Sequence, residues 1–225
     1  MLAAGPLSAQ IAFTDVTDLS GINYVGESWG GSAGDYNGDG LTDIAVNNHR
    51  SKAALYLNLG GMRFQDEGGQ VAVWNSFPFS DQHGASWADW DGDGDQDLLV
   101  TQGARDPAQF LINDSGQLTD QISLFTFDEA NSGGRMPVWF DWNGDGLLDL
   151  ATAVAGARFH IHEQVGGDFL RANFVTGNTC TGSTFGGQLA DVTLDGKPDW
   201  ICSNPSGFPN RMYAYSTLPF TDVPS

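Results

Sequence analysis

The stretch "DWDGDGDQD" at residues 89–97 holds five aspartates in nine residues, with two glycines among them. Carboxylates at this density repel one another, so the arrangement needs a cation to offset their charge. Every second position carries an oxygen side chain, and glycine lets the backbone bend tightly. The stretch therefore indicates a turn that gathers oxygen atoms around one centre.

Three further stretches share this pattern and occur at nearly constant spacing. They are "DYNGDGLTD" at 35–43, "DWNGDGLLD" at 141–149 and "DVTLDGKPD" at 191–199. The first aspartates of the four stretches lie 54, 52 and 50 residues apart. A second marker recurs at intervals of 51, 54, 51 and 51 residues, and its members are Phe13, Phe64, Leu118, Phe169 and Phe220. Two markers that share one period indicate a repeat architecture.

Each repeat has the pattern of short β-strands. An apolar run such as "DLLVTQ" follows each acidic stretch, a second run follows it, and the Phe/Leu marker closes the unit as a fourth strand. Four antiparallel strands per unit, repeated, predict an all-β fold, a β-propeller with about four blades. We assign residues 1–10 to a leader or signal-peptide remnant. We assign 11–225 to the propeller, in units of about 13–63, 64–117, 118–168 and 169–219.

The acidic stretches, called acidic loops 1 to 4 in chain order, carry oxygen side chains at positions 1, 3, 5 and 9 and glycine at position 6. Hard oxygen donors without His or Cys select a hard cation, and several carboxylates on a flexible loop favour Ca²⁺ over Mg²⁺. The main-chain carbonyl at position 7 would supply a further ligand. The candidate ligands are Asp35, Asn37, Asp39, Leu41, Asp43, Asp89, Asp91, Asp93, Asp95, Asp97, Asp141, Asn143, Asp145, Leu147, Asp149, Asp191, Thr193, Asp195, Lys197 and Asp199.

An EF-hand shares the first half of this pattern, but it needs a bidentate acid at position 12 between two helices. Position 12 is Val46, Val100, Thr152 or Cys202 in these loops, and the flanking segments have strand patterns. The acidic loops are therefore not EF-hands.

The chain resembles the FG-GAP/VCBS repeats of β-propellers, as found in integrin α-subunit heads and in bacterial and fungal surface proteins and lectins. The resemblance rests on acidic loops 1 to 3, their following apolar strands and "FTDVT" at 13–17, and it covers about 11–222. It implies loops that join two strands of a blade and hold structural calcium. Loop 4 departs from the family, with Thr193 at position 3 and Leu194 in place of glycine. We therefore expect three strong Ca²⁺ sites and one degenerate site.

Composition limits the partners. The 225 residues include 28 Asp and Glu against 9 Lys and Arg, a formal charge of −19. The few basic residues are far outnumbered by acidic ones and cannot neutralise phosphates, which argues against a nucleic-acid partner and against an anionic membrane surface. No apolar run approaches the length of a membrane span. Together with the resemblance, this favours an extracellular or cell-surface protein, secreted or periplasmic, whose partner is a protein or a glycan.

The marker strands raise a question about ring closure. If each marker strand is the outermost strand of a blade, the segment at 11–16 is one outer strand too many. This favours a chain that supplies four blades of a larger ring, of about seven, which further blades or subunits complete. The alternative is a compact four-bladed ring with a frayed extra strand.

Two functions fit these observations, and neither is enzymatic. The first is a calcium-binding module for adhesion or for carbohydrate or protein recognition, and the second is a non-binding scaffold segment or subunit. A polysaccharide-active enzyme is a weaker alternative, because no catalytic motif or separate acid cluster occurs. His160 and His162 share a strand face, but no third metal ligand accompanies them.

Other residues have a structural and a functional interpretation. Trp87, Trp90, Trp139 and Trp142 recur in register, which favours wedging between blades over sugar stacking. Trp29 and Trp74 do not recur, and they are the better candidates for ligand contact. Cys180 and Cys202 form a disulfide or stay as free thiols, and Asn113-Asp114-Ser115 is a glycosylation sequon.

Overall fold

Four antiparallel sheets of four strands each make up the fold, and they confirm the predicted β-propeller. The computed structural model describes residues 12–76, 81–103, 107–126, 134–154, 158–171, 186–203, 210–214 and 221–222. The expected leader at 1–10 lies outside the described residues. So does Cys180, so the disulfide stays a prediction.

Each sheet is one blade, and its strands pair in chain order. Blade 1 consists of β1 (Ser28–Gly34), β2 (Asp43–Asn48), β3 (Ala54–Asn58) and β4 (Phe64–Asp66). Blade 2 consists of β5 (Gln82–Ala88), β6 (Asp97–Gln102), β7 (Gln109–Asp114) and β8 (Gln117–Asp120). Blade 3 consists of β9 (Gly134–Phe140), β10 (Asp149–Val154), β11 (Arg158–Val165) and β12 (Asp168–Arg171). Blade 4 consists of β13 (Gly186–Ala190), β14 (Asp199–Ser203), β15 (Arg211–Ala214) and β16 (Thr221–Asp222).

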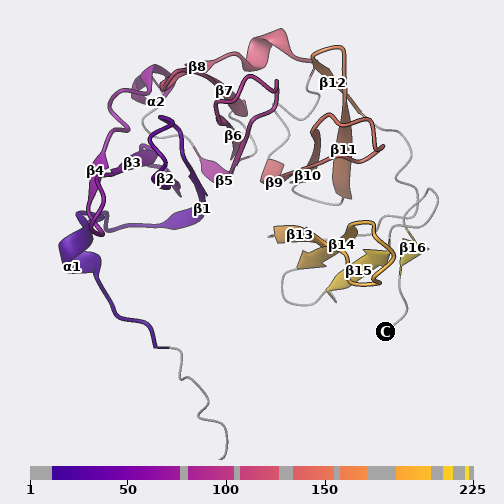
Figure 1. The fold of residues 1–225 in the computed structure, drawn as a ribbon, viewed down its shortest axis with the longest axis horizontal. Helices are drawn as coiled ribbons and strands as arrows, with labels where there is room; N and C mark the ends of the chain where they lie inside the picture. The colour runs from indigo at the N-terminus through magenta and orange to yellow at the C-terminus, as the bar shows by residue number, and fades with distance from the viewer. Residues whose placement is uncertain are drawn as a thin grey trace, which may run out of the picture.

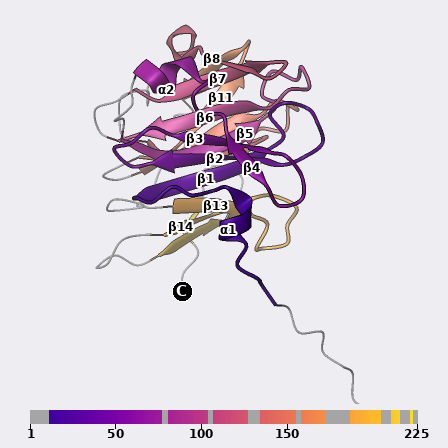
Figure 2. The same cartoon turned by 90° about the vertical axis from the view of Figure 1, so that its left-hand side faces the viewer.

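The blades are arranged around a common centre, with the first strand of each blade innermost (Figure 1). The innermost strands contact in sequence, β1 with β5, β5 with β9, and β9 with β13. Among the described residues no comparable contact joins blade 4 to blade 1, and Figure 1 shows an opening there. The blades therefore follow an arc, and Figure 2 shows from the side how their strands stack.

Glycines let the innermost strands approach closely. A Cβ atom at Gly30 would lie 2.6 Å from the His83 carbonyl oxygen of blade 2. One repeat later, a Cβ atom at Gly84 would lie 2.6 Å from the Met136 amide nitrogen of blade 3. A larger residue would push neighbouring blades apart at both positions.

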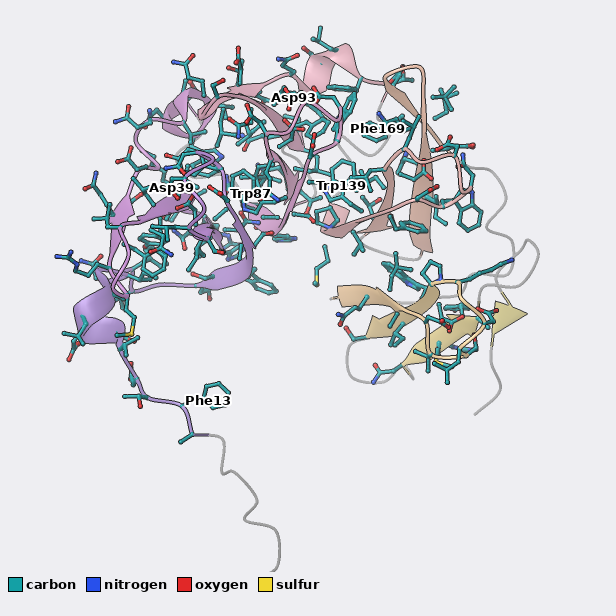
Figure 3. All side chains as sticks on the ribbon, viewed as in Figure 1. Phe13, Asp39, Trp87, Asp93, Trp139 and Phe169 are labelled. Carbon is teal, nitrogen blue, oxygen red and sulfur yellow. The ribbon has the colours of Figure 1, made fainter. Side chains whose placement is uncertain are left out.

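The recurring tryptophans wedge between blades, as predicted. The indole nitrogen of Trp87 donates to the Ser32 carbonyl of the preceding blade at 3.3 Å. Trp139 makes the equivalent bond to the Ser86 carbonyl at 3.5 Å, and both tryptophans lie between neighbouring blades in Figure 3. Trp90 and Trp142, at position 2 of their loops, are buried in separate hydrophobic clusters. Sugar stacking is therefore not the role of Trp87, Trp90 and Trp142, which are 9%, 8% and 6% exposed.

The predicted strand at 11–16 is wrong for the residues that the structure describes. Residues 12–16 form no strand, and a short helix, α1 (Thr17–Ser20), follows them. Phe13 is 96% exposed and lies away from the blades (Figure 3). The matching sequence is a strand at Phe64 because β3 is there to pair with it.

Two other short helical elements lie between blades. These are α2 (Ala72–Ser76) and the 3₁₀ helix η1 (Ile122–Leu124). Within the described part of the chain, no helix has both the length and the apolar character that a bilayer crossing requires. Trp74 of α2 is fully buried and donates to the Gln109 side chain at 3.0 Å, so it is a core residue and not a ligand contact.

Candidate metal centres in the acidic loops

The acidic loops connect the first and second strands of each blade. Loop 1 runs from the end of β1 to the start of β2, and the other loops occupy the same place in blades 2 to 4. Because the blades are repeats, the loops recur at the same end of each hairpin. Asp39 and Asp93 in Figure 3 mark the first two loops.

The position 1 aspartate accepts a backbone hydrogen bond from the position 6 glycine in all four loops. The bonds are Gly40 N to Asp35 Oδ2 at 2.8 Å, Gly94 N to Asp89 Oδ2 at 3.1 Å, Gly146 N to Asp141 Oδ2 at 3.0 Å and Gly196 N to Asp191 Oδ2 at 3.0 Å. Each glycine has a positive φ, between 84° and 99°. The turn thus folds back over its own first residue.

The position 5 aspartate stabilises the second half of the turn. Its Oδ1 accepts the backbone N–H of position 7, for example Leu41 N to Asp39 at 2.8 Å and Asp95 N to Asp93 at 2.9 Å. Loops 3 and 4 have the same bond at 2.8 and 3.0 Å. The side chains of positions 1 and 5 are therefore held on the inner side of the turn.

Oxygens from positions 1, 3 and 5 converge. In loop 2, one carboxylate oxygen from each of Asp89, Asp91 and Asp93 lies within 4.8 Å of the others. In loop 1 the N–H of Asp39 donates to both Asp35 Oδ1 and Asn37 Oδ1 at 3.1 Å, which places these two oxygens around one point. Loop 3 repeats this arrangement at Asp145, with bonds of 3.2 and 2.9 Å.

One oxygen of loop 2 fits a cation directly. Asp89 Oδ1 is buried and accepts no hydrogen bond from the described residues. A carboxylate oxygen hidden from water without a partner is unfavourable unless a cation is bound to it. The residues present in loop 2 therefore suit a hard divalent ion.

The position 9 aspartate has a role that the sequence did not reveal. Asp43, Asp97, Asp149 and Asp199 are at most 1% exposed. In loop 3, Asp149 Oδ2 accepts Trp142 N at 2.7 Å and Oδ1 accepts Gln164 N of β11 at 2.7 Å. Loops 1 and 2 make both bonds as well. This residue ties the loop to the third strand of its blade.

Burial changes the proton affinity of these position 9 carboxyls. Loss of hydration raises the pKa of Asp97 and of Asp149 to about 6, although the backbone hydrogen bonds oppose the rise. The pKa of Asp43 is raised for the same reason.

Position 7 points its side chain away from the loop centre. Leu41 and Leu147 are 38% and 43% exposed. The side chain of Asp95 accepts Ser115 N of the next turn at 2.7 Å. The position 7 side chains therefore lie outside the turn. This agrees with a ligand role for the main-chain carbonyl of position 7 and not for its side chain.

Loop 4 keeps the turn but changes its chemistry. The hydroxyl of Thr193 lies 3.4 Å from Asp199 Oδ1, so it faces the position 9 carboxylate. Leu194 adopts φ 60°, whereas glycine occupies the same position in the other loops with φ from 72° to 80°. A side chain in this left-handed region is strained.

We expect Leu194→Gly to stabilise the protein by about 0.5–1 kcal/mol, because the left-handed strain exceeds the entropy lost by glycine. Leu194 is 86% exposed, so little burial is lost. Thermal unfolding would show a rise in Tm of about 1–4 °C. The reverse change Gly144→Leu in loop 3 is the matched control, and it should lower Tm. A lower Tm for Leu194→Gly would contradict the strain.

Two other expectations from the sequence concern His160 with His162 and the sequon at Asn113. His160 and His162 lie on β11, and no third metal-ligating residue joins them among the described residues. The sequon residue Asn113 is 1% exposed, and its amide donates to the Tyr36 and Gln96 carbonyls at 2.7 and 3.0 Å. Glycosylation of the folded protein at Asn113 is therefore ruled out.

The sequence analysis missed one group of potential ligands. His49, Asp81 and His83 each offer one ligand atom within 4.8 Å of the others, away from the acidic loops. The only signal in the sequence is the D-x-H spacing at 81–83, which would place both side chains on the same side of an extended chain. Nothing local connects these residues to His49.

The four blades of this β-propeller are structural repeats, because each has an acidic loop between its first and second strands. Residues 35–100 and 89–152 both match the FG-GAP-like repeat family, and together they span more than half of the chain. The chain belongs to this family. A search of curated proteins finds no match to the chain.

Proposed function

We propose that acidic loops 1 to 3 bind Ca²⁺ and that this calcium is structural. The observation that supports the proposal is the convergence of Asp89, Asp91 and Asp93 around the unpartnered oxygen Asp89 Oδ1. Carboxylate and amide oxygens on a flexible turn are the ligands of Ca²⁺. Loop 4 has a threonine hydroxyl at position 3, so its site is weak.

Calcium bound in an acidic loop would stabilise the arrangement of the strands in its blade. The ion would contact positions 1, 3 and 5 of the turn, and the position 9 aspartate already binds the third strand through Asn58, Asn113 or Gln164. A bound ion therefore fixes the hairpin of strands one and two relative to strand three. It also offsets part of the repulsion within the loop.

We further propose that the propeller is a non-enzymatic recognition module of a secreted or cell-surface protein, with a glycan or a protein as partner. Membership of a repeat family that is usually extracellular supports this location, and the net charge of −19 argues against a nucleic acid. Extracellular calcium is also high enough to fill sites with millimolar affinity.

A glycan array tests the recognition role. We expect the full chain to bind a defined set of glycans in calcium and to lose this binding in EGTA, because the loops hold the blades in place. The paired variant Asp91→Ala, which removes a position 3 ligand, should weaken binding in calcium. The absence of binding in both buffers would reject glycan recognition and leave a protein partner or a scaffold.

The open arc favours a second candidate, a scaffold that further blades or subunits complete. No contact comparable to those between neighbouring blades joins blade 4 to blade 1 among the described residues. A closed propeller buries these two blade faces against each other. Light scattering would distinguish the scaffold from the recognition module. A scaffold of this kind forms a defined assembly with its partner blades, whereas the recognition module stays monomeric.

A further inference from the structure

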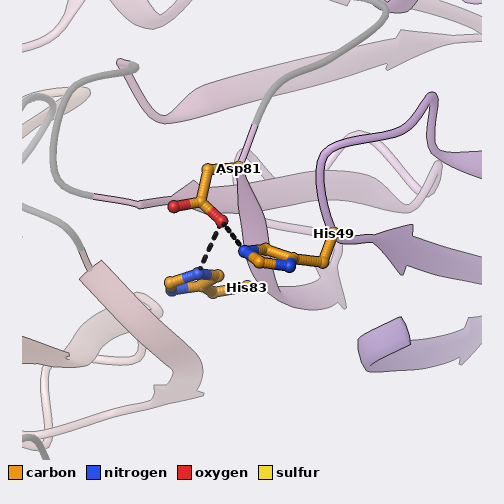
Figure 4. A group of neighbouring side chains, drawn as sticks. All are labelled: His49, Asp81 and His83. Carbon is orange, nitrogen blue, oxygen red and sulfur yellow. Dashed lines mark hydrogen bonds and ion pairs between the residues drawn. The ribbon is translucent and has the colours of Figure 1, made fainter. Parts of the chain in front are cut away.

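His49, Asp81 and His83 converge at the junction of blades 1 and 2 (Figure 4). Asp81 Oδ1 lies 2.7 Å from His49 Nε2 and 2.9 Å from His83 Nε2. The side chains of His49 and His83 are 11% and 10% exposed, and that of Asp81 is 35% exposed. Two imidazole nitrogens thus face one carboxylate oxygen in a mostly enclosed place.

The backbone holds these residues in position. His49 N donates to the Glu27 carbonyl at 2.8 Å, and His49 forms a β-bridge with Asp81. Gly103 N donates to the Asp81 carbonyl at 2.5 Å. A Cβ atom at Gly103 would collide with the Asp81 carboxylate, so the glycine makes room for this side chain. The cluster is therefore built on fixed strand ends.

A second carboxylate orients His49. Glu27 Oε2 lies 2.7 Å from His49 Nδ1, while Asp81 Oδ1 faces Nε2 of the same ring. A carboxylate on Nδ1 is the usual outer partner of a histidine that binds metal through Nε2, because it fixes the tautomer and the ring orientation.

Trp29 forms a wall of the cluster. Its ring lies 5.2 Å from the His49 ring and 5.5 Å from the His83 ring, between centroids. Both imidazoles therefore have little freedom to turn away. Packing against the two histidines explains the position of Trp29, an aromatic residue that does not recur in the other repeats.

We propose that His49, Asp81 and His83 form a site for a divalent transition metal, with Zn²⁺ as the best fit. Two imidazoles and one carboxylate suit Zn²⁺ and do not suit Ca²⁺. The metal would lie between the three ligand atoms, which are within 4.8 Å of one another. Three protein ligands leave a fourth tetrahedral position for water or an external ligand.

The geometry needs only a small adjustment to admit the ion. Ligand atoms about 2.0–2.1 Å from Zn²⁺ lie roughly 3.3 Å apart in a tetrahedron, compared with the observed contacts of 2.7 and 2.9 Å. The Asp81 side chain is the most exposed of the three and can move by this amount. The ligand atoms of all three residues already lie within 4.8 Å of one another.

This site is separate from the acidic loops. His49 follows the end of β2 that is remote from loop 1, and His83 begins β5 at the end remote from loop 2. The ligands come from two blades, so a bound metal would connect blade 1 to blade 2. The inference does not depend on calcium in the loops.

Titration of the full chain with zinc in excess calcium tests the proposal. Excess calcium competes with zinc for the carboxylates of the acidic loops, so that zinc bound there is displaced. We expect one zinc per chain by calorimetry, with proton release that changes the measured heat between buffers. Cobalt should give the intense visible absorption of a tetrahedral site. Absence of zinc binding in excess calcium would overturn the proposal.

Variants identify the ligands. His49→Ala and His83→Ala should abolish the cobalt spectrum and weaken zinc binding at least tenfold, and Glu27→Gln should weaken zinc binding about 10–100-fold without changing the spectrum. His160→Gln, on β11, is the matched histidine control and should change neither. Melting curves without added metal show whether each variant is folded. Unchanged zinc affinity in folded His49→Ala and His83→Ala would place the ion elsewhere and overturn the proposal.

Discussion

Removal of calcium with EGTA is expected to lower the Tm of the protein by about 8–16 °C. A site with Kd near 0.1 mM in about 1 mM calcium adds roughly 1.4 kcal/mol to the free energy of unfolding. Three such sites add about 4 kcal/mol, a large fraction of the stability of a domain. In a chain of this size each kcal/mol shifts Tm by about 2–4 °C.

Calorimetry or circular dichroism would measure this shift, and addition of calcium beyond the EGTA should restore the original curve. Sodium chloride at equal ionic strength is the control for screening of the −19 charge, and it should restore only a small part. Magnesium should also be a poor substitute, because it demands a rigid octahedral site. A melting curve that is the same in calcium and in EGTA would contradict structural calcium.

Replacement of Asp149 by alanine is expected to lower the free energy of unfolding by about 3 kcal/mol. The change removes two hydrogen bonds to a charged acceptor and leaves the buried N–H groups of Trp142 and Gln164 without a partner. The unfavourable burial of the carboxylate, which raises its pKa to about 6, offsets part of this loss. Urea unfolding of both proteins measures the difference.

The matched control is Asp114→Ala, at the exposed end of β7, which should change stability by less than about 0.5 kcal/mol. The comparison is made in EGTA, so that loss of a metal ligand does not contribute. Equal stability of Asp149→Ala and Asp114→Ala in EGTA would show that the position 9 aspartate is only a metal ligand and not a tie to the third strand.

The repeat architecture could be predicted because its signals are local. The spacing of the acidic loops and of Phe64, Leu118 and Phe169 follows from the length of a four-stranded blade, and each marker does lie in an outermost strand. Phe13 lies in the same marker sequence, but it is not part of a strand. A strand forms only where a neighbouring strand pairs with it, and the sequence of one segment does not show whether such a neighbour is present.

The candidate sites also contain features that local sequence predicts and features that it does not. The convergence of Asp89, Asp91 and Asp93 follows from alternation within one turn, so the sequence predicted it. The tie from Asp97 to Asn113 spans 16 residues, and local spacing gave position 9 the same role as positions 1, 3 and 5.

Contacts between blades that do not recur from repeat to repeat were the hardest to predict. His49 and Asp81 are brought together by two separate blades, and Trp74 is buried in a hydrophobic cluster that blades 1 and 2 both supply. Such contacts depend on how the blades pack, which the pattern within one repeat does not determine.

A crystal structure of the full chain, grown in calcium chloride, would show whether acidic loops 1 to 3 hold calcium. We expect an anomalous peak inside each of the loops 35–43, 89–97 and 141–149, about 2.3–2.6 Å from the oxygens of positions 1, 3 and 5. Ordered loops with no such peak, in crystals that contain ample calcium, would contradict calcium binding by these loops.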